Sequence, residues 1–533
     1  MVRFPRSLAR IAPPTAAAFA AVAAVVFTIV VVQWSARVGR LAHEATYDDV
    51  VYFLDGLRRV RVFEVHGSAA GLWDLLSTPP HSPLSTLLAL GSFALFGVHE
   101  AAPYYANGLA VLALLLLSLR AAVPQSRPGT LAVLLATLCI PFSFWAVHEF
   151  RPDFFSGLAT AASALFAFEA TAVTSPARRS RRFALAGLLG AFAIFAKPSF
   201  FAHAIVMAAA TTAVAWLLLR SHGFSGREIV GPLLSYVASF GVAGGAPLVW
   251  NLREIVGYFI LNTFGSHSHT FTIKGSFAAV LDYYLIDGAA VSLIGRYGVV
   301  FLGAFVVMLP LAWRRSRDGT LLAVSLLAVS GASLAIMLIG RHQSPYFGLP
   351  FQLLLWLAFL ELASAFARGR LGWLLAATVF LIALVWQGHA PPPQPVFSAP
   401  VGLARGTFNH EILTPVSRDA EASHPGDVAW VFITVAGSVN AATLEWMAES
   451  RRLPLRFADM HHSSDLGEFR KVFPKSDYIV APAVDAPGVF EWLPAAAVRA
   501  PVLEELSRPP YIILREPSAL LPYFIIRNEH VTR

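Results

Sequence analysis

The sequence predicts an α-helical polytopic membrane protein that ends in a soluble α/β domain. Of its 533 residues, 56% are hydrophobic and only 14% are charged, whereas soluble domains carry roughly 25% charged residues. Long apolar runs recur up to residue 389, and hydrophobicity falls after the proline-rich segment that follows. The runs are too numerous for a single anchor, so they are predicted to form the membrane domain itself.

The spans are assigned from the length of each apolar run. A spanning helix needs about 20 apolar residues, and eleven runs are assigned as spans. They cover residues 11–34, 103–119, 129–147, 154–174, 183–197, 198–219, 229–250, 289–312, 319–339, 345–366 and 371–388. The run at 83–97 is only about 15 residues long, so we expect it to lie in the membrane interface or to re-enter the membrane.

Arginine residues between the spans predict their orientation. If the N-terminus is cytoplasmic, every cytoplasmic loop contains arginine, as the positive-inside rule requires. These residues are Arg120 and Arg127; Arg178, Arg179, Arg181 and Arg182; Arg220 and Arg227; Arg314, Arg315 and Arg317; and Arg368 and Arg370. If 83–97 were a further span, the later arginine clusters would lie on the outer face, against the positive-inside rule. The favoured orientation places the first outer loop, residues 36–102, and the C-terminal segment on the outer face.

Composition also restricts the partners of the chain. The net charge of +8 is explained by the cytoplasmic arginines, so membrane lipids are expected partners and nucleic acid is not. Cys139 is the one cysteine, which excludes a disulfide framework and a cysteine-based metal site.

The chain is predicted to divide at the linker that begins Ala390-Pro-Pro-Pro-Gln-Pro, a stiff proline-rich segment. Residues 1–389 are assigned to a transmembrane catalytic domain, and residues 390–533 to a soluble α/β domain outside the membrane. Short runs of β-branched and aromatic residues predict strands in this domain. A longer segment that mixes polar and apolar residues predicts a helix. The strands are expected at 427–434, 477–481 and 511–514, and the helix at 440–450.

Two adjacent acids, Asp48 and Asp49, follow the first span. Val50, Phe53 and Leu57 recur after them at helical spacing, so an amphipathic helix on the membrane surface is predicted to begin here. The helix dipole favours acids at a helix N-terminus, which would be a purely structural explanation. We favour a functional one, because adjacent carboxylates near a membrane raise each other's pKa and suit acid–base chemistry.

Further charged residues are predicted at the outer ends of the spans. Asp153 opens the fourth span and Lys197 ends the fifth. Arg341 and His342 follow the ninth span, and His81 precedes the short run at 83–97. Each has a structural explanation: helix capping for Asp153, snorkelling to the interface for Lys197, lipid headgroups for Arg341 and His342, and an ordinary loop histidine for His81. A shared site for an anionic substrate would explain them together.

Cations on the outer face indicate a substrate with a phosphate group and a long apolar tail. Arginine grips phosphate bidentately, and a polyprenyl-phosphate sugar is the activated donor expected outside the cytoplasmic membrane. A carboxylate would deprotonate an acceptor hydroxyl, while cations would stabilise the departing lipid phosphate. These residues therefore predict a glycosyltransferase.

Six short motifs also follow one another along the chain in a defined order. They are the acid pair with Tyr52, the segment 79–83 leading to 95–97, Asp153, the run 187–198, the step from Pro247 to Trp250, and Arg341-His342 leading to Tyr346. Over most of residues 20–390 this order resembles the GT-C glycosyltransferases of the family 39 type. That group includes protein O-mannosyltransferases and lipid A aminoarabinose transferases.

The resemblance implies a GT-C fold and an inverting reaction. The catalytic residues that it implies are Asp48, as general base, Asp49 and Asp153. Those implied for the donor lipid phosphate are Lys197, Arg341, His342 and His81. Many members of the group act without a metal, so no metal site is predicted, and a divalent cation stays open as a cofactor.

The chain departs from the family pattern at three positions. Asp49 stands where the family has glutamate, His81 where a lysine is common, and Val51 where the aminoarabinose enzymes have arginine. These departures argue against a close aminoarabinose transferase. The sugar is open, and the acceptor could be a glycan, a lipid or a protein.

Two other classes of protein remain as alternatives. A flippase for lipid-linked glycans should carry ionisable residues within its spans, whereas the charges here gather at span ends. A polysaccharide polymerase or ligase would centre on basic residues in its outer loops, and the acid pair argues against it.

Overall fold

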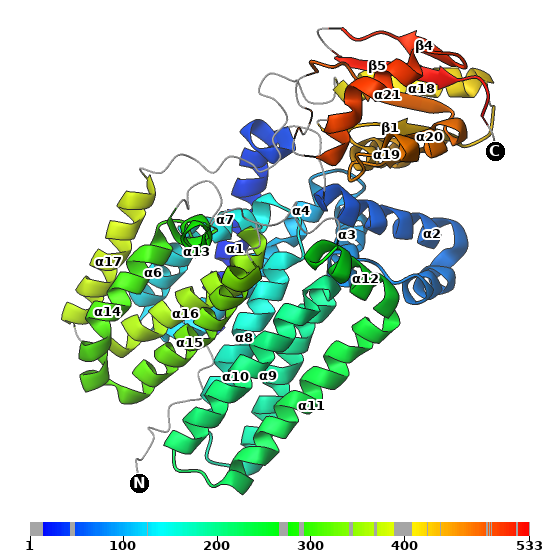
Figure 1. Cartoon of the computed structure of the whole chain (residues 1–533). Coiled ribbons are helices and arrows are strands. Elements are labelled where there is room, and N and C mark those ends of the chain that lie inside the picture. Colours follow the sequence, from blue (N-terminus) through cyan, green and yellow to red (C-terminus); the bar gives the residue numbers. More distant parts are fainter. Residues whose placement is uncertain are drawn as a thin grey trace. The chain divides into compact units, whose positions relative to one another are not determined.

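The structure is a computed structural model, and its chain forms two compact units, described in turn below (Figure 1). The first comprises Met1–Val31, Pro79–Ser85 and Tyr104–Pro393; the second comprises Val32–Thr78, Thr86–Pro103 and Gln394–Arg533. The structure describes residues 14–42, 48–124, 126–265, 276–286, 293–340, 345–366, 370–388, 408–423, 425–437, 439–486, 489, 491, 493–518 and 521–531.

Helices build the first unit. They are α1 (Pro14–Val38), α4 (Ala102–Ala106), α5 (Gly108–Ala122), α6 (Arg127–Leu138), α7 (Pro141–His148), α8 (Asp153–Thr171), α9 (Pro176–Ala196), α10 (Phe201–Ser221), α11 (Gly226–Trp250), α12 (Leu252–Thr263), α13 (Phe277–Leu281), α14 (Tyr297–Arg315), α15 (Arg317–Gly340), α16 (Leu349–Phe366) and α17 (Arg370–Gly388). Short helical turns lie at Pro198–Phe200, Asp282–Ile286 and Pro345–Gly348.

Most of the eleven predicted spans are helices that meet a test of length and apolar composition. Among the described residues, eight helices are long and apolar enough to cross a membrane, and the pair α6–α7, bent by 65°, makes up to nine. The first turns of α9 contain four arginines, which shorten its apolar part. Within α17 the described apolar stretch is Ala377–Trp386. By length and composition, the described residues therefore provide eight or nine candidate spans. These helices make the chain an integral membrane protein.

Two helices form the centre of the first unit. In both α8 and the helical stretch Tyr346–Ala365, 89% of the apolar window is buried inside the protein. Gly157 permits this packing, because a Cβ added there would lie 3.0 Å from the Leu349 Cβ and from Leu353 Cδ1. The start of α8, where Asp153 lies, is thereby fixed against the start of α16.

The second unit contains the segment predicted to be the first outer loop, together with the C-terminal segment. The loop provides α2 (Asp48–Ser77) and most of α3 (Pro83–Phe96), preceded by a turn at Arg40–Ala42. The helix α2 is broken at Gly67, whose φ of 79° lies in the left-handed region that glycine adopts readily. As expected, α3 is an apolar helix shorter than a membrane span.

A five-stranded sheet forms the core of the C-terminal segment. The strands β1 (Ala429–Ile433), β2 (Leu455–Asp459), β3 (Tyr478–Pro482), β4 (Tyr511–Arg515) and β5 (Tyr523–Asn528) lie in the order β2-β1-β3-β5-β4. Strand β1 is parallel to β2 and β3, and β5 is antiparallel to β3 and β4. This confirms the α/β class and the three predicted strands, and adds β2 and β5.

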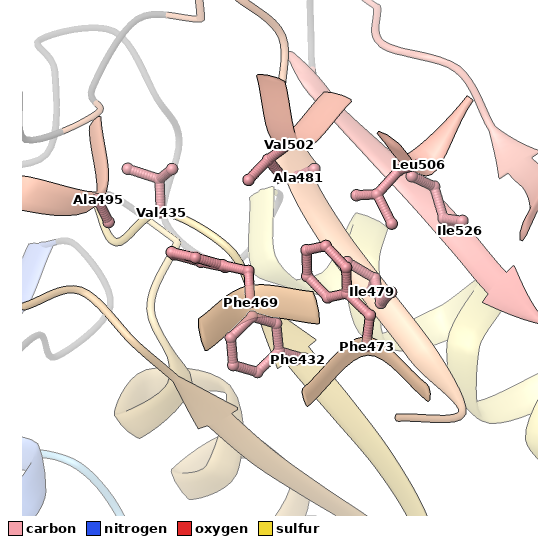
Figure 2. Close-up of a cluster of buried hydrophobic side chains, with 10 residues drawn as sticks. All are labelled: Phe432, Val435, Phe469, Phe473, Ile479, Ala481, Ala495, Val502, Leu506 and Ile526. Carbon is pink, nitrogen blue, oxygen red and sulfur yellow. The ribbon is translucent and has the colours of Figure 1, made fainter. Parts of the chain in front are cut away.

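Helices cover this sheet. They are α18 (Phe408–Ser423), α19 (Ala441–Arg451), which confirms the predicted helix, α20 (Leu466–Val472) and α21 (Arg499–Leu506). A buried cluster joins the sheet to α20 and α21, and Figure 2 shows its side chains converging from strands and helices. It comprises Phe432, Val435, Phe469, Phe473, Ile479, Ala481, Ala495, Val502, Leu506 and Ile526.

Candidate active site

The acid pair lies at the N-terminus of α2, in the second unit. Asp48 is the first residue of the helix, as predicted, and its side chain lies outside the described residues. Asp49 is fully buried, and its carboxylate forms an ion pair with Arg40, with Nε and Oδ2 3.1 Å apart. Arg40 lies in the short turn before α2, so this buried pair ties the start of the helix to the preceding chain.

The apolar face of α2 is covered by protein. Val50, Phe53 and Leu57 are each fully buried, and the ring of Phe53 meets that of Trp446, on α19, edge-on at 4.7 Å. Trp446 also stacks on Phe93 of α3, with ring centroids 5.7 Å apart. We expected this face to lie on the membrane surface, and the C-terminal domain and α3 occupy it instead.

Charged residues extend the contact between α2 and α19. Arg58 donates to the Glu445 carboxylate at 2.6 Å. The same carboxylate accepts a hydrogen bond from Arg456 at 2.9 Å and one from the backbone N–H of Phe457 at 2.6 Å. Because Glu445 is almost fully buried, its charge depends on these donors, and the contact fixes α19 to both α2 and β2.

The first prediction concerns Trp446, at the centre of this contact. Trp446→Ala should lower the free energy of unfolding of the second unit by about 3–5 kcal/mol, because truncating a buried tryptophan leaves a cavity. Limited proteolysis of the detergent-purified protein would measure it as faster cleavage in α2 and in the C-terminal domain. Trp430→Ala, which truncates a half-exposed tryptophan on β1, is the control. Equal protease resistance of wild type and Trp446→Ala would contradict the prediction.

A second charged cluster lies at the head of α8, in the first unit. The Lys197 ammonium is 2.5 Å from Oδ1 of Asp153, and both side chains are largely buried. Nζ of Lys197 also lies 5.2 Å from the centre of the Phe347 ring. Oδ2 of Asp153 is buried and has no hydrogen-bond partner within the described residues. Asp153 and Lys197 were predicted to lie on the same side of the membrane, and in the structure they are in direct contact.

Local sequence explains how this pair is positioned. Pro198 follows Lys197 and ends the regular α9 helix, because proline cannot continue the hydrogen bonds of a helix interior. The backbone of Lys197 is extended, with φ −142° and ψ 92°. Asp153 lies in the first turn of α8, where the helix dipole stabilises a carboxylate.

Glu149 organises the turn before Asp153. Its carboxylate is buried, lies 2.8 Å from Nε of Arg151 and accepts a hydrogen bond from the Tyr346 hydroxyl. The Arg151 guanidinium lies over the Tyr346 ring, 4.2 Å from its centre, a favourable cation–π geometry. Asn107 donates to the backbone carbonyl of Glu149 at 2.9 Å. Tyr346 is thus fastened to the turn that leads into α8.

Of the remaining predicted residues, the structure describes His81 and Asp49. His81 is exposed, and its ring contacts Tyr258 edge-on at 5.2 Å. Arg341 and His342 lie outside the described residues. Asp49 lies in the second unit, whereas Asp153 and Lys197 lie in the first. In the part of the chain that the structure describes, no group of three or more His, Cys, Asp or Glu residues could hold a metal ion.

Three residues of these clusters were not predicted as site residues: Arg40, Glu149 and Tyr346. Arg40 carries no signal that separates it from other arginines near span ends. Glu149 and Arg151 did carry one, because two opposite charges flank Phe150 between apolar segments, and such residues must be paired when buried.

The fold is similar to that of the solved structures of ArnT. Neither a family model nor a curated protein matches the sequence. The crystal structure of ArnT from Cupriavidus metallidurans bound to undecaprenyl phosphate aligns with 97% of this chain and 98% of its own, with a TM-score of 0.56 and 14% identity. For ArnT in the apo state the coverages are 96% and 97%, the TM-score is 0.53 and the identity is 14%.

A third solved structure is an oligosaccharyltransferase from Archaeoglobus fulgidus tethered to an acceptor peptide. It aligns with 86% of this chain and 69% of its own, with 13% identity and a TM-score of 0.46. The likeness to ArnT extends over nearly the whole chain, so it includes the C-terminal domain as well as the membrane helices.

Proposed function

We propose that this chain, which has the GT-C fold of ArnT, is a membrane glycosyltransferase. Its donor would be a polyprenyl-phosphate sugar, and its acceptor would receive the sugar on the outer face of the cytoplasmic membrane. The observation that carries the proposal is the buried Asp153–Lys197 pair at the head of the central helix α8. It supplies a cation where apolar helices end, in a fold shared with a protein crystallised with undecaprenyl phosphate.

The proposed reaction is a single inverting displacement. Asp48 removes the proton from an acceptor hydroxyl, and the resulting oxygen attacks the anomeric carbon of the donor. The bond from that carbon to the phosphate oxygen breaks, and the polyprenyl phosphate leaves with the electron pair. The acceptor oxygen and the anomeric carbon form the new glycosidic bond.

Cations stabilise the leaving phosphate in this reaction. Lys197, Arg341, His342 and His81 are proposed to contact it, because negative charge develops on the phosphate as the bond breaks. Asp153 then acts by holding the Lys197 ammonium in place. Arg341 and His342 would be positioned by the cluster that Glu149 forms with Arg151 and Tyr346. Tyr346 follows these two cations closely in sequence, and its hydroxyl is hydrogen-bonded to Glu149.

The orientation is part of the proposal. Residues 1–389 would form the catalytic membrane domain, with a cytoplasmic N-terminus, and residues 390–533 would lie outside the membrane. The arginines of the cytoplasmic loops support this orientation, and so does the need for the acids and the lipid phosphate to meet on one face.

A reconstituted assay tests the proposed activity. Full-length protein in proteoliposomes, given radiolabelled polyprenyl-phosphate hexoses or pentoses and an envelope extract, should transfer label to an acceptor and release polyprenyl phosphate. Mass spectrometry of envelope glycans and glycolipids from a deletion strain should show the loss of the same sugar. Movement of the labelled lipid between leaflets without release of polyprenyl phosphate would instead identify a flippase and refute the proposal.

A further inference from the structure

The α2–α19 contact fixes the direction in which the two helices run. Phe53 and Arg58 meet Trp446 and Glu445, in the middle of α19. The later residues Arg61 and Glu64 meet the Glu449 carbonyl at 3.5 Å and Arg452, just after the helix, at 3.6 Å. From its middle to its end, α19 thus follows α2 in the same overall sense. The N-termini of α2 and α19 therefore lie at the same end of the contact.

This direction places one edge of the sheet next to the acid pair. Helix α19 follows β1, so its N-terminus lies at the carboxyl end of that strand. Strands β2 and β3 are parallel to β1, and Ile433 at the end of β1 pairs with Asp459 at the end of β2. The carboxyl edge of the parallel strands thus lies toward the end of α2 that carries Asp48 and Asp49. In Figure 1, α19 lies between β1 and α2.

Polar side chains gather at this carboxyl edge, directly after β2. Nδ1 of His461 lies 2.5 Å from Oδ1 of Asp459, and the rings of His461 and His462 contact each other with centroids 3.9 Å apart. The Asp459 and His461 side chains are partly exposed, at 17% and 30%. Within the described residues, their hydrogen bond leaves Oδ2 of Asp459 and Nε2 of His461 to bond other groups.

The charges of the segment that directly follows β2 restrict the class of ligand. The segment 459–468 contains three acids, Asp459, Asp465 and Glu468, and no lysine or arginine. A phosphate or carboxylate would be repelled by them, whereas the adjacent hydroxyls of a sugar both donate and accept hydrogen bonds. In sheets of this kind, ligands bind outside the carboxyl ends of the strands.

We propose that Asp459 and His461 form a carbohydrate-binding site that holds the acceptor beside the acid pair. The ligand is a sugar without phosphate or carboxylate groups. The role as acceptor site rests on the proposed function, whereas binding of carbohydrate at this edge does not.

A glycan array tests the binding site without any transfer reaction. Labelled full-length protein in detergent is applied to neutral and acidic glycans. Wild type should bind at least one neutral glycan, and His461→Ala and Asp459→Asn should weaken that binding by about tenfold or more, as expected for the loss of a hydrogen bond to a charged group. His530→Ala is the matched control, because His530 is an exposed histidine after β5, at the opposite edge of the sheet.

The outcomes are distinct. Binding to acidic glycans only, binding to no glycan, or equal binding by wild type and both variants would overturn the site. Asp459→Asn keeps the shape of the side chain, so a loss with unchanged thermal unfolding is assigned to the site. In the transfer assay, both variants should raise the acceptor KM and leave the donor KM unchanged. Glycan binding without any transfer would refute the proposed function and leave the carbohydrate site standing.

Discussion

Asp48→Asn is expected to reduce sugar transfer by about 10²–10⁴-fold, the usual contribution of a general base. Asparagine keeps the size of the side chain and can still cap α2, so the helix should form, but it cannot accept the proton of the acceptor hydroxyl. The measurement is kcat with donor and acceptor both saturating, in the reconstituted assay. Donor binding, measured separately with the labelled lipid, should stay within a few-fold of wild type.

Glu64→Gln provides the matched control, because Glu64 is a half-exposed acid on the same helix. It should retain activity, since surface ion pairs contribute little to stability. Full transfer by Asp48→Asn would remove Asp48 from the mechanism. An equal loss in both variants would show that the helix tolerates no change of charge, and would remove the special role of Asp48 as well.

Lys197→Met should have the second large effect, on activity and on stability together. Loss of the cation beside the leaving phosphate is expected to lower kcat by about 10²–10³-fold. The Asp153 carboxylate would stay buried without its partner, which destabilises a protein by about 3–5 kcal/mol. Thermal unfolding in detergent and the transfer assay would measure the two effects independently.

A double variant separates these two effects. In Lys197→Met/Asp153→Leu both members of the buried pair are removed, so neither leaves an unpaired charge. Stability should therefore recover to near the wild-type value, while activity should stay low. The matched control is Arg120→Met/Glu169→Leu, which removes another buried ion pair, made by a residue near the opposite end of α8. Recovery of activity with stability in the first double variant would make Lys197 a structural residue.

Much of the fold follows from local pattern. Asp48 begins α2 because an acid at a helix N-terminus precedes apolar residues at helical spacing, and this signal needs no distant partner. Asp153 and Lys197 were predicted to lie at the outer ends of consecutive spans, which is consistent with their contact in the structure. The three predicted strands are short apolar runs, which are readily recognised. The residues of β1 and β3 are largely buried, whereas β4 is partly exposed.

The partner of each buried face was not predictable in the same way. The spacing of Val50, Phe53 and Leu57 specifies that one side of α2 is buried, and a lipid surface and Trp446 satisfy that requirement equally. Strand β2 was missed because Arg456 and Asp459 interrupt its apolar residues, and β5 because Pro522 directly precedes it. The four arginines at the start of α9 were assigned to a loop, although they lie within the helix.

The packing of α19 on α2 also governs when the acid-bearing helix can be completed during synthesis. Trp446 is made almost four hundred residues after Phe53, and at about 5–20 residues per second the interval is on the order of 20–80 s. Throughout that time the side of α2 that bears Val50, Phe53 and Leu57 lacks its cover from α19. The helix that carries Asp48 and Asp49 therefore gains its final support only near the end of translation, so a truncated chain would possess the acids without the framework that holds them.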